Sequence, residues 1–450
     1  MKRLASHQRY AVAVMHSVDG LGIFYDAGCG KTMCALTWLY EAMMKGEMTG
    51  ALIICPAGLV GTWEYALDRV TEFEGFDEEG KELLKSLVEI RSFQKIYHSE
   101  RRLYYTKKGK EKYKRIVELR EDVDRYWDAV IIDESHCIGA HDSVQTQACH
   151  LLAKLSKRRY IMTGTPVSGG GGKEDFQKLF GQIQFLEPGK WSSWTAWKEE
   201  YVLREDRWYK PSMYDVEKCR ALMNEYGISA RLRDCFDMPP ETHSTVPCEI
   251  ACRAVYKDLR EKKVLKYKVD LRTAGGMWAK LRQVCSGFLL NTEGVMEIQC
   301  AKDIALGDLL DGTDEPVVIF CFYTHSIDKV EDIARKHGRN PVVYDGRSKD
   351  ESWREFQFGD KDTVIVQYNA GSAGLDLFKG TKTIYYEPTL SSLALEQSMA
   401  RTMRKGQTKH CTYYYLSTPH TVESEIWDSV RNGVSVTREM MDEWAREGRI

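Results

Sequence analysis

The sequence predicts an α/β protein with two parallel-sheet lobes. Short apolar runs that end in polar side chains alternate with segments of helical periodicity, which is the pattern of strands buried on both faces of a parallel sheet. This alternation occurs in both halves of the 450-residue chain. It is interrupted at SGGGGK (168–173), after which an aromatic-rich, mostly helical region extends to about residue 295.

The first half contains four expected strands. GLGIFYD precedes the glycine-rich segment GCGKT, and the pattern TMCALTWLYEAMMKG that follows predicts a helix. The next expected strands are ALIICP (51–56), WDAVIIDE (127–134) and RRYIMTGTP (158–166). Because ligands gather at the carboxyl ends of parallel strands, the polar residues that follow these runs are candidate site residues.

The second half repeats the pattern. Its expected strands are PVVIFCFY (316–323), NPVVYDG (340–346), DTVIVQYNA (362–370), KTIYYEP (382–388) and HCTYYYL (410–416), and VTREMMDEWAREGRI predicts a terminal helix. We therefore expect three parts. They are a first lobe over 1–180 with a helical protrusion at about 64–126, a helical insert and linker over 181–295, and a second lobe over 296–450.

Positive charge is concentrated locally, since the formal net charge of the whole chain is only −2. Residues 91–120 contain eleven Lys or Arg against three acids, with tyrosines between them, and residues 253–282 contain ten against three. Basic residues mixed with aromatics suit a nucleic-acid backbone and its bases. The alternative is a solvated helix face with a few packed aromatics. The candidate nucleic-acid contacts are Lys107, Lys108, Lys110 and Lys112.

The 13 cysteines are scattered along the chain. They include no CxxC pair and no Cys/His spacing typical of a zinc site, so we expect reduced, mostly packed thiols of a cytoplasmic protein. The N-terminal segment MKRLASHQRY lacks an apolar core long enough for a signal peptide. No apolar run approaches the roughly 18 residues of a membrane helix.

The segment GCGKT lies between an expected strand and an expected helix and predicts a phosphate site. Gly28, Cys29 and Gly30 would place backbone N–H groups around phosphate oxygens at the positive end of the helix. Lys31 would contact the β- and γ-phosphates, and Thr32 would bind Mg²⁺. The match is incomplete, because a tyrosine occupies the position of the first glycine in G-x-x-x-x-G-K-[ST].

Two further segments end expected strands of the first half. In DESH, Asp133 could hold Mg²⁺ through water, and Glu134 could orient and deprotonate an attacking water. In TGTP, Thr163 and Thr165 could bridge the γ-phosphate region and a nucleic-acid groove. Either segment alone is also compatible with a turn that merely ends a strand. The position of DESH after a second buried strand favours the catalytic interpretation.

The second half offers a loop and a basic segment. AGSAGLDL (370–377) follows a strand, and its small residues permit a close approach of phosphate or ribose, with Asp376 as a ribose contact. In QSMARTMRKGQT, the residues Gln397, Arg401 and Arg404 fall at i, i+4 and i+7, which predicts one helix face. Arginine suits the charge that develops on a transferring phosphoryl group. Without the other motifs, two salt-bridged surface arginines would be the better interpretation.

These motifs occur in the order found in superfamily-two helicase motors, and their details resemble the Swi/Snf-type DNA translocase branch. A glutamine near the N-terminus is followed by GCGKT, IICPAGLVGTW, DESH, TGTP, GSAGLDL and QSMARTMRKGQ. The segment ARLRDCFDMPPE is similar to the family's arginine-rich stretch before a proline pair. The resemblance covers nearly the whole chain and implies two RecA-like parallel-sheet lobes with helical insertions.

In the first lobe, the resemblance implies residue roles as follows. Gln8 looks like the glutamine that reads the adenine edge. Lys31 and Thr32 match the phosphate and magnesium contacts, and Asp133 and Glu134 match the magnesium ligand and the catalytic base.

For the second lobe, the resemblance implies that Gly374 and Asp376 belong to the loop that couples ATP to DNA. Arg401 and Arg404 match the pair that reaches the γ-phosphate, with Arg404 the better candidate for an arginine finger. His136 would connect the acidic motif of the first lobe to TGTP, which matches the coupling motif of that lobe.

The implied function is a DNA-stimulated ATPase that uses ATP and Mg²⁺ to translocate on duplex or branched DNA, remodelling DNA structures or displacing bound protein. The compact chain resembles viral or bacterial members of the family. Three alternatives stay open: an RNA-dependent helicase of the same superfamily, the motor subunit of a defence or restriction complex, and a catalytically inactive nucleic-acid-binding scaffold. The intact motif residues argue against the inactive scaffold.

Overall fold

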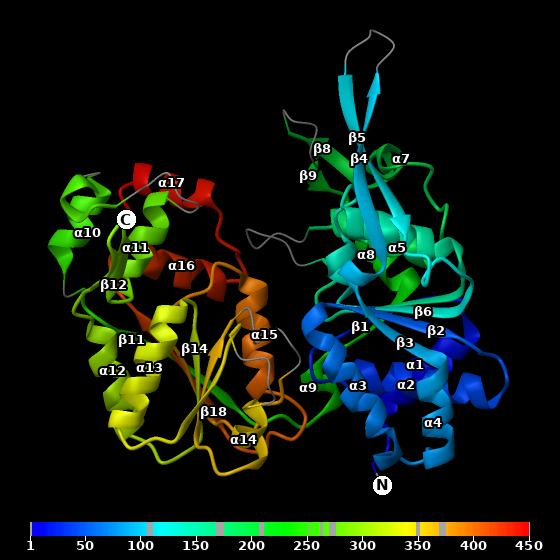
Figure 1. The fold of residues 1–450 in the computed structure, drawn as a ribbon, viewed down its shortest axis with the longest axis horizontal. Helices are drawn as coiled ribbons and strands as arrows, with labels where there is room; N and C mark the ends of the chain where they lie inside the picture. Colours follow the sequence, from blue (N-terminus) through cyan, green and yellow to red (C-terminus); the bar gives the residue numbers. More distant parts are fainter. Residues whose placement is uncertain are drawn as a thin grey trace. The chain divides into compact units, whose positions relative to one another are not determined.

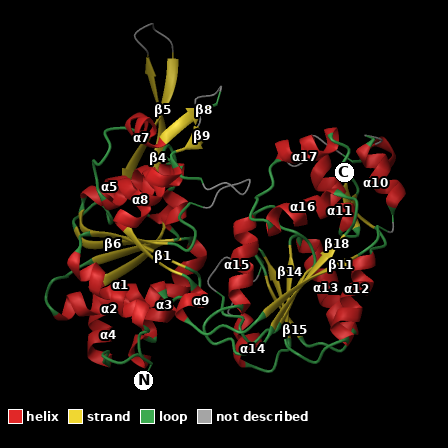
Figure 2. Cartoon of the chain, turned by 180° about the vertical axis from the view of Figure 1, so that it is seen from behind, coloured by secondary structure: helices red, strands yellow, loops and turns green. Residues whose placement is uncertain are grey.

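The chain folds into two compact units, each a parallel sheet with helices on both faces (Figure 1, Figure 2). The computed structural model describes residues 2–105, 111–167, 175–206, 211–250, 252–261, 264–269, 276–347, 352–368 and 375–449. Unit 1 contains Met1–Ser168 and Glu174–Asp237, and unit 2 contains Met238–Ile450. The predicted α/β class with two parallel-sheet lobes is confirmed.

Unit 1 is built on a six-stranded sheet in which all neighbouring strands are parallel. The inner strands are almost entirely buried, as expected for continuous apolar runs such as ALIIC. In spatial order, the strands are β10 (Gly227–Ala230), β1 (Gly20–Tyr25), β7 (Ser156–Met162), β6 (Trp127–Asp133), β2 (Ala51–Cys55) and β3 (Val88–Ser92).

Helices cover both faces of this sheet (Figure 1, Figure 2). Alternate strand residues point to opposite faces, so that Leu52 and Ile54 share a core with Leu152, Leu179 and Ile183. One face carries α1 (Ser6–Ser17), α2 (Lys31–Met44), α3 (Val60–Asp68) and α4 (Glu78–Leu87). The other carries α5 (Val144–Lys154), α6 (Gln177–Leu186) and α8 (Val216–Tyr226), and α9 (Leu232–Cys235) follows β10.

Two antiparallel ribbons lie outside the sheet of unit 1. β4 (Tyr97–Tyr105) and β5 (Glu111–Leu119) form a long ribbon that extends away from the sheet (Figure 1). β8 (Val202–Glu205) and β9 (Pro211–Tyr214) form a shorter one next to α7 (Trp194–Tyr201). The prediction of a helical protrusion at about 64–126 is therefore corrected for 97–119. Tyrosines and β-branched residues alternate there with charges, and they favour strands.

Unit 2 is built on a second six-stranded parallel sheet. All five strands predicted in the second half are present. In spatial order, the strands are β11 (Glu241–Pro247), β18 (Cys411–Ser417), β17 (Lys382–Tyr385), β14 (Val317–Cys321), β16 (Thr363–Gln367) and β15 (Pro341–Tyr344). A small antiparallel ribbon of β12 (Phe288–Asn291) and β13 (Gly294–Glu297) accompanies the sheet.

The helices of unit 2 build one core on each face of its sheet. α12 (Ala301–Asp311) and α13 (Thr324–Lys336) pack on one face. The other face carries α10 (Arg253–Arg260), α11 (Gly276–Cys285), α14 (Trp353–Phe358), α15 (Ser392–Thr402), α16 (Val422–Arg431) and α17 (Arg438–Arg446). A buried ion pair between Lys302 and Glu423 joins α12 to α16. Short 3₁₀ turns are η1 (Ala57–Leu59), η2 (Val70–Glu72), η3 (Phe93–Lys95), η4 (Ser135–Ile138) and η5 (Val264–Tyr267).

Residues 181–295, which the sequence analysis sets apart as one helical segment, are divided between the two units. β10 completes the sheet of unit 1, and β11 completes that of unit 2. These two strands and β3 were not foreseen. All three lie at the edge of a sheet, where a strand has a single neighbour. Their burial is partial, so their sequences lack the continuous apolar run that marks an inner strand.

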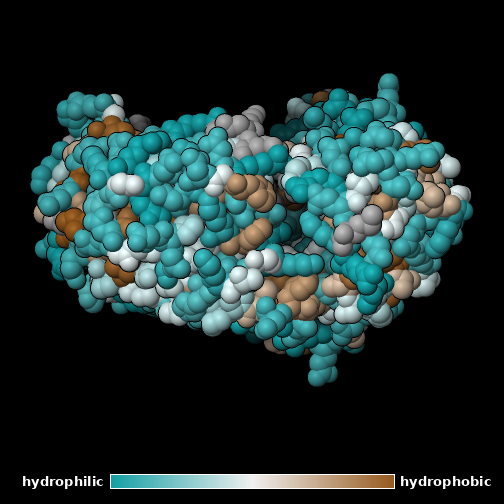
Figure 3. Space-filling view, turned by 90° about the horizontal axis from the view of Figure 1, so that it is seen from below, coloured by the Kyte–Doolittle hydropathy of each residue, from teal (hydrophilic) through white to brown (hydrophobic). Residues whose placement is uncertain are grey.

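One face of the molecule is mostly polar. Figure 3 shows one face on which hydrophilic side chains predominate and apolar side chains are scattered in small groups. Among the helices of the described residues, none combines the length and the apolar character that a membrane span requires.

Candidate nucleotide site and arginine segment

The loop between β1 and α2 has the backbone form of a phosphate loop. Gly28 and Gly30 have φ of 87° and 78°, a left-handed conformation that favours glycine. Gly30 caps α2, so the N–H groups of the first helical turn are directed out of its N-terminus. Lys31 begins that helix, and its Nζ donates to the backbone oxygens of Tyr25 (2.8 Å) and Asp26 (3.3 Å). Thr32 follows in the same turn.

Gln8 contacts this loop directly. Its side chain is buried, its Nε2 donates to the backbone oxygen of Cys29 at 3.1 Å, and its Oε1 accepts from Ala5 N at 2.9 Å. A Cβ atom on Gly30 would lie 2.0 Å from Gln8 Nε2, so the close approach also requires glycine there. The carboxamide of Gln8 is thus engaged by the loop. Its contact with adenine stays a prediction.

Asp133 ends β6 and is held by an unforeseen partner, Trp63. The Asp133 carboxylate accepts from Trp63 Nε1 on α3 and from Glu134 N, both at 2.9 Å. Burial and the neighbouring Glu134 carboxylate raise the pKa of Asp133 to about 6, against the opposing effects of Lys31 and Trp63. Two hydrogen bonds therefore fix the orientation of the carboxylate, but its negative charge is not neutralised by its surroundings. A bound cation would supply that neutralisation.

Glu134 occupies a strained position next to it. Its φ and ψ are both 51°, a left-handed conformation that costs an L-residue about 1–2 kcal/mol. His136 Nδ1 lies 3.3 Å from Glu134 Oε2 and 3.1 Å from Thr163 Oγ1. Burial opposes the charge on His136, but contacts with Cys137 and Glu134 outweigh it and raise its pKa to about 9. At neutral pH a protonated imidazole therefore lies between the acidic motif and TGTP.

TGTP also lies against the phosphate loop. A Cβ atom on Gly164 would lie 3.3 Å from the backbone oxygen of Tyr25 and 3.4 Å from Ala27 N. Thr165 N donates to Thr163 Oγ1 at 3.1 Å. The ends of β1, β6 and β7 thus converge at one edge of the sheet, which brings GCGKT, DESH and TGTP together within unit 1.

Gln182 on α6 is a second residue that the sequence analysis missed. Its fully buried carboxamide accepts from Ser135 Oγ at 2.7 Å and donates to the backbone oxygen of Pro166 at 2.8 Å. It therefore bridges DESH and TGTP. The available signals were weak: Gln182 is a polar residue within an apolar helix, and Trp63 ends the motif IICPAGLVGTW.

In unit 2, the arginine segment differs from the prediction. α15 ends at Thr402, so Gln397 and Arg401 share the helix but Arg404 lies beyond its end. The prediction of a single helix face for all three is therefore wrong. Arg401 is largely buried at 9% exposure, whereas Arg404 is partly exposed. Met403 follows the helix with φ of −90° and ψ of 85°, so the chain leaves the helical conformation before Arg404.

Arg404 is paired with Asp376. Its guanidinium forms an ion pair with that carboxylate and donates to the backbone oxygen of Leu375 at 3.1 Å. Gln407, nearly fully buried, donates to the backbone oxygens of Phe378 (2.9 Å) and Gly380 (3.1 Å). The end of the arginine segment is thereby fastened to the loop that carries Asp376. Gly374 lies outside the described residues.

The four lysines predicted to contact nucleic acid lie in or beside the stretch of sequence that joins β4 to β5. Lys107, Lys108 and Lys110 lie outside the described residues, and of Lys112 only the backbone is described, in β5 opposite Tyr104. The described part of the ribbon pairs Arg101 with Arg115 across the strands. Arg102 on the same ribbon is paired with Glu100 and Glu118. A contact of this ribbon with nucleic acid stays a prediction.

Comparison with known families identifies the chain. A model of the SNF2-related domain matches residues 7–287, and a model of the helicase conserved C-terminal domain matches residues 301–406. This protein belongs to the SNF2-related family. It is accordingly an ATP-dependent, helicase-like enzyme, as the order of motifs predicted.

Curated relatives are similar over most of this chain. The uncharacterized ATP-dependent helicase YqhH of Bacillus subtilis (strain 168) is 23% identical, over 92% of this chain and 75% of that protein. The DNA repair and recombination protein RAD54-like of Drosophila grimshawi is 23% identical, over 98% of this chain and 63% of its own length. The DNA repair and recombination protein RDH54 of Saccharomyces cerevisiae (strain JAY291) is 20% identical, over 91% and 50%.

The SNF2-related chain therefore spans less than two thirds of the length of the two recombination proteins. Among solved structures, the Sulfolobus solfataricus SWI2/SNF2 ATPase core in complex with dsDNA is 17% identical. That similarity covers 99% of this chain and 93% of the other, with a TM-score of 0.40.

Proposed function

We propose that this SNF2-related protein is a DNA-stimulated ATPase that translocates on duplex or branched DNA, remodelling DNA structures or displacing bound protein. The observation that carries the proposal is the chain of contacts from Glu134 through His136 to Thr163. It connects the candidate catalytic base to a segment that could sense nucleic acid, within the unit that also holds Lys31.

ATP and Mg²⁺ fit the groups at this edge of the sheet. The loop from Gly28 to Lys31 offers backbone N–H groups and an ammonium that donates to two backbone oxygens. Thr32 and Asp133 offer a hydroxyl and a carboxylate, the hard oxygen ligands that Mg²⁺ prefers. Bound Mg²⁺ would neutralise charge on the phosphates. Lys31 would exchange its contacts with Tyr25 and Asp26 for phosphate oxygens.

We propose that Glu134 activates the attacking water and that His136 controls its availability. While protonated His136 holds the Glu134 carboxylate, that carboxylate is a weaker base. A shift of Thr163 when DNA binds would draw His136 away and free Glu134. Nucleic acid would then stimulate hydrolysis through a side-chain contact within one unit.

The second unit would supply cations for the transition state. Arg404 is the candidate arginine finger, and its ion pair with Asp376 would have to open before it could reach a phosphate. Asp376 would then be released for the ribose contact that the sequence predicts. Arg404 and Asp376 thus hold each other in the described structure, and nucleotide would compete with that pair.

DNA is the proposed nucleic acid because two independent features favour an anionic duplex. The β4–β5 ribbon concentrates positive charge, and phosphate contacts of this kind give sequence-independent, salt-sensitive binding. Two of the curated relatives carry names of DNA repair and recombination proteins. The preference for duplex or branched DNA over single strands belongs to the same proposal.

The test is steady-state ATPase activity with duplex DNA, a four-way junction, single-stranded DNA and RNA at matched nucleotide concentration. We expect stimulation by duplex or junction DNA. Glu134→Gln should lower kcat by about 10²–10⁴-fold while leaving ATP binding intact, because a positioned general base contributes about that much. Glu121→Gln, an exposed carboxylate outside the site, is the matched control and should keep full activity.

Other outcomes would overturn parts of the proposal. Stimulation by RNA alone would replace the DNA translocase with an RNA-dependent helicase. Activity indifferent to every nucleic acid would remove the proposed coupling. Absence of ATPase activity in the presence of normal DNA binding would indicate an inactive scaffold. Stimulation that requires a partner complex would indicate a subunit of a defence system.

A further inference from the structure

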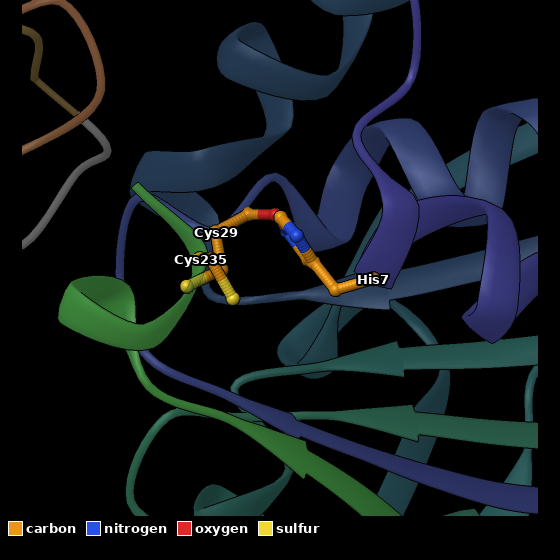
Figure 4. A group of neighbouring side chains, drawn as sticks. All are labelled: His7, Cys29 and Cys235. Atoms are coloured by element: carbon orange, nitrogen blue, oxygen red, sulfur yellow. The ribbon is translucent and has the colours of Figure 1, made fainter. Parts of the chain in front are cut away.

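Three side chains that favour soft metal ions meet beside the phosphate loop. His7 in α1, Cys29 in the loop and Cys235 in α9 each offer one ligand atom, and these atoms lie within 4.8 Å of one another. Figure 4 shows the two sulfur atoms side by side and the His7 ring extending from α1 toward Cys29. All three residues belong to unit 1. They are far apart in the sequence and meet because β10 pairs with β1.

The imidazole of His7 is fixed by a hydrogen bond and by two ring contacts. His7 Nε2 lies 2.9 Å from the backbone oxygen of Cys29. A carbonyl oxygen only accepts, so this contact places the proton on Nε2 and leaves the lone pair on Nδ1. The rings of Tyr25 and Phe236 pack edge-on against the imidazole, and Tyr25 Oη donates to the backbone oxygen of His7 at 2.8 Å.

The two thiols are held by backbone contacts. Cys29 is fully buried between two glycines of positive φ, which direct its side chain inward. Cys235 ends α9, and that helix is tied to the end of β1 because the Asp26 carboxylate accepts from Leu232 N at 3.0 Å. Asp26 N also donates to the backbone oxygen of Ala230 at 3.0 Å. The contacts between the ends of β1 and β10 therefore determine the positions of both sulfur atoms.

We propose that His7, Cys29 and Cys235 form a zinc site that fastens the phosphate loop to α1 and α9. Tetrahedral zinc places its nitrogen and sulfur ligands about 3.6–3.8 Å apart, so the group needs to contract by only about 1 Å. Three protein ligands leave the fourth position for a water molecule. Imidazole and thiolate select zinc over Mg²⁺, which separates this site from the oxygen ligands Thr32 and Asp133.

Zinc explains the cluster better than a disulfide does. A disulfide would use the two thiols and leave the oriented imidazole without a role. A metal ion would use all three side chains, and it would supply the positive charge that the thiolates of buried Cys29 and partly buried Cys235 require.

The test uses the full chain, stripped of metal with a chelator and then titrated with Zn²⁺ or Co²⁺. We expect one zinc to stay with each wild-type chain after desalting, measured by elemental analysis, and a thiolate-to-cobalt charge-transfer band on adding Co²⁺. Zinc should also raise the melting temperature, since it binds the folded state. Cys235→Ser should weaken zinc binding by at least about tenfold and abolish the band, because a ligand is lost.

Two further variants keep the test decisive. Cys252→Ser changes a partly exposed cysteine of unit 2 and should bind zinc as the wild type does. His7→Gln keeps a donor for the Cys29 oxygen but removes the ring nitrogen, so it should weaken zinc binding without lowering the melting temperature of the metal-free protein. The His7→Gln variant tests the loss of a ligand even if Cys235→Ser fails to fold.

Two outcomes would overturn the proposal. One is a wild-type protein that retains no zinc after desalting. The other is a Cys235→Ser or His7→Gln variant that binds zinc as tightly as the wild type. Because the readouts are metal content, absorption and melting, the result is independent of whether DNA stimulates ATP hydrolysis.

Discussion

The two units hold their candidate phosphate-binding residues in different ways. In unit 1 these residues follow the ends of β1, β6 and β7, and backbone pairing of three strands places them at one edge. In unit 2 Arg404 lies beyond the end of α15, where the carboxylate of Asp376 and the backbone oxygen of Leu375 hold it. One site is fixed by sheet topology, and the other by a few polar side-chain contacts.

The difference indicates how each site should respond to substitution. A sheet edge keeps its geometry when one functional side chain is removed, because the strand pairs are unaffected. The arginine segment lies outside the sheet, and it is joined to the preceding loop by Gln407, by Asp376 and by a backbone hydrogen bond from Leu377 N to the oxygen of Arg401. We therefore expect substitution of Lys31 in unit 1 to affect chemistry alone, and substitutions in the arginine segment of unit 2 to affect chemistry and local stability together.

The largest expected effect is that of Arg404→Ala. Arginine fingers contribute about 10³–10⁵-fold to phosphoryl transfer, so kcat for ATP should fall by about 10³-fold or more. The measurement is DNA-stimulated ATPase under saturating ATP. Arg335→Ala, an exposed arginine paired with Glu331 on α13, is the matched control and should leave kcat unchanged. A similar kcat for both variants would return Arg404 to a structural role.

Lys31→Ala should have the next largest effect, because it removes a cation from the γ-phosphate. Loss of one such electrostatic contact lowers kcat by about 10²–10³-fold. The melting temperature should stay close to that of the wild type, since Lys31 donates to two backbone oxygens and has no ion pair among the described residues. Lys45→Ala, beyond the other end of α2, is the control. Strong destabilisation by Lys31→Ala would contradict the distinction between the units.

Gln407→Ala tests the hydrogen bonds by which Gln407 joins the arginine segment to the preceding loop in unit 2. The substitution leaves the buried oxygens of Phe378 and Gly380 without their donor, which should lower the free energy of unfolding by about 1–3 kcal/mol. Urea unfolding measures the change. We also expect reduced ATPase activity, because the loop of Asp376 loses its attachment to the arginine segment. An unchanged free energy of unfolding would show that the hydrogen bonds of Gln407 do not stabilise this part of unit 2.

The smallest expected effect concerns pH and His136. Its folded-state pKa of about 9 lies above the ordinary value of 6.5, so the folded protein binds this proton more tightly than the unfolded chain. The resulting stabilisation is complete below about pH 6.5 and is lost as the pH rises through about 9. Urea unfolding across this range should show the loss in the wild type and a smaller loss in His136→Gln. Identical profiles would exclude a raised pKa of His136 in the folded protein.

Sequence reasoning succeeded where one segment carries its own signal. The inner strands were recognisable because burial on both faces requires a continuous apolar run. The glycines of GCGKT predicted a phosphate loop, and Gly28 and Gly30 both have a positive φ, which favours glycine. The contact between His136 and Thr163 was implied by the family resemblance, and the two side chains do meet.

Sequence reasoning failed where a feature depends on residues far away in the chain. The edge strand β10 has no apolar run because it has only one neighbour. The end of α15 before Arg404 was missed, since helical spacing alone does not show where a helix stops. Trp63 and Gln182 gave little signal, because their functional contacts lie in other segments.

The sequence by itself determined the α/β class, the order of the motifs and the family, because these depend on short runs of residues and on their succession. The tertiary structure alone decided which groups meet. It placed Trp63 on Asp133, paired Arg404 with Asp376, and brought His7 and Cys235 to Cys29. The physical reason is that strand pairing and burial act between segments far apart in the chain, where sequence spacing carries no information about distance.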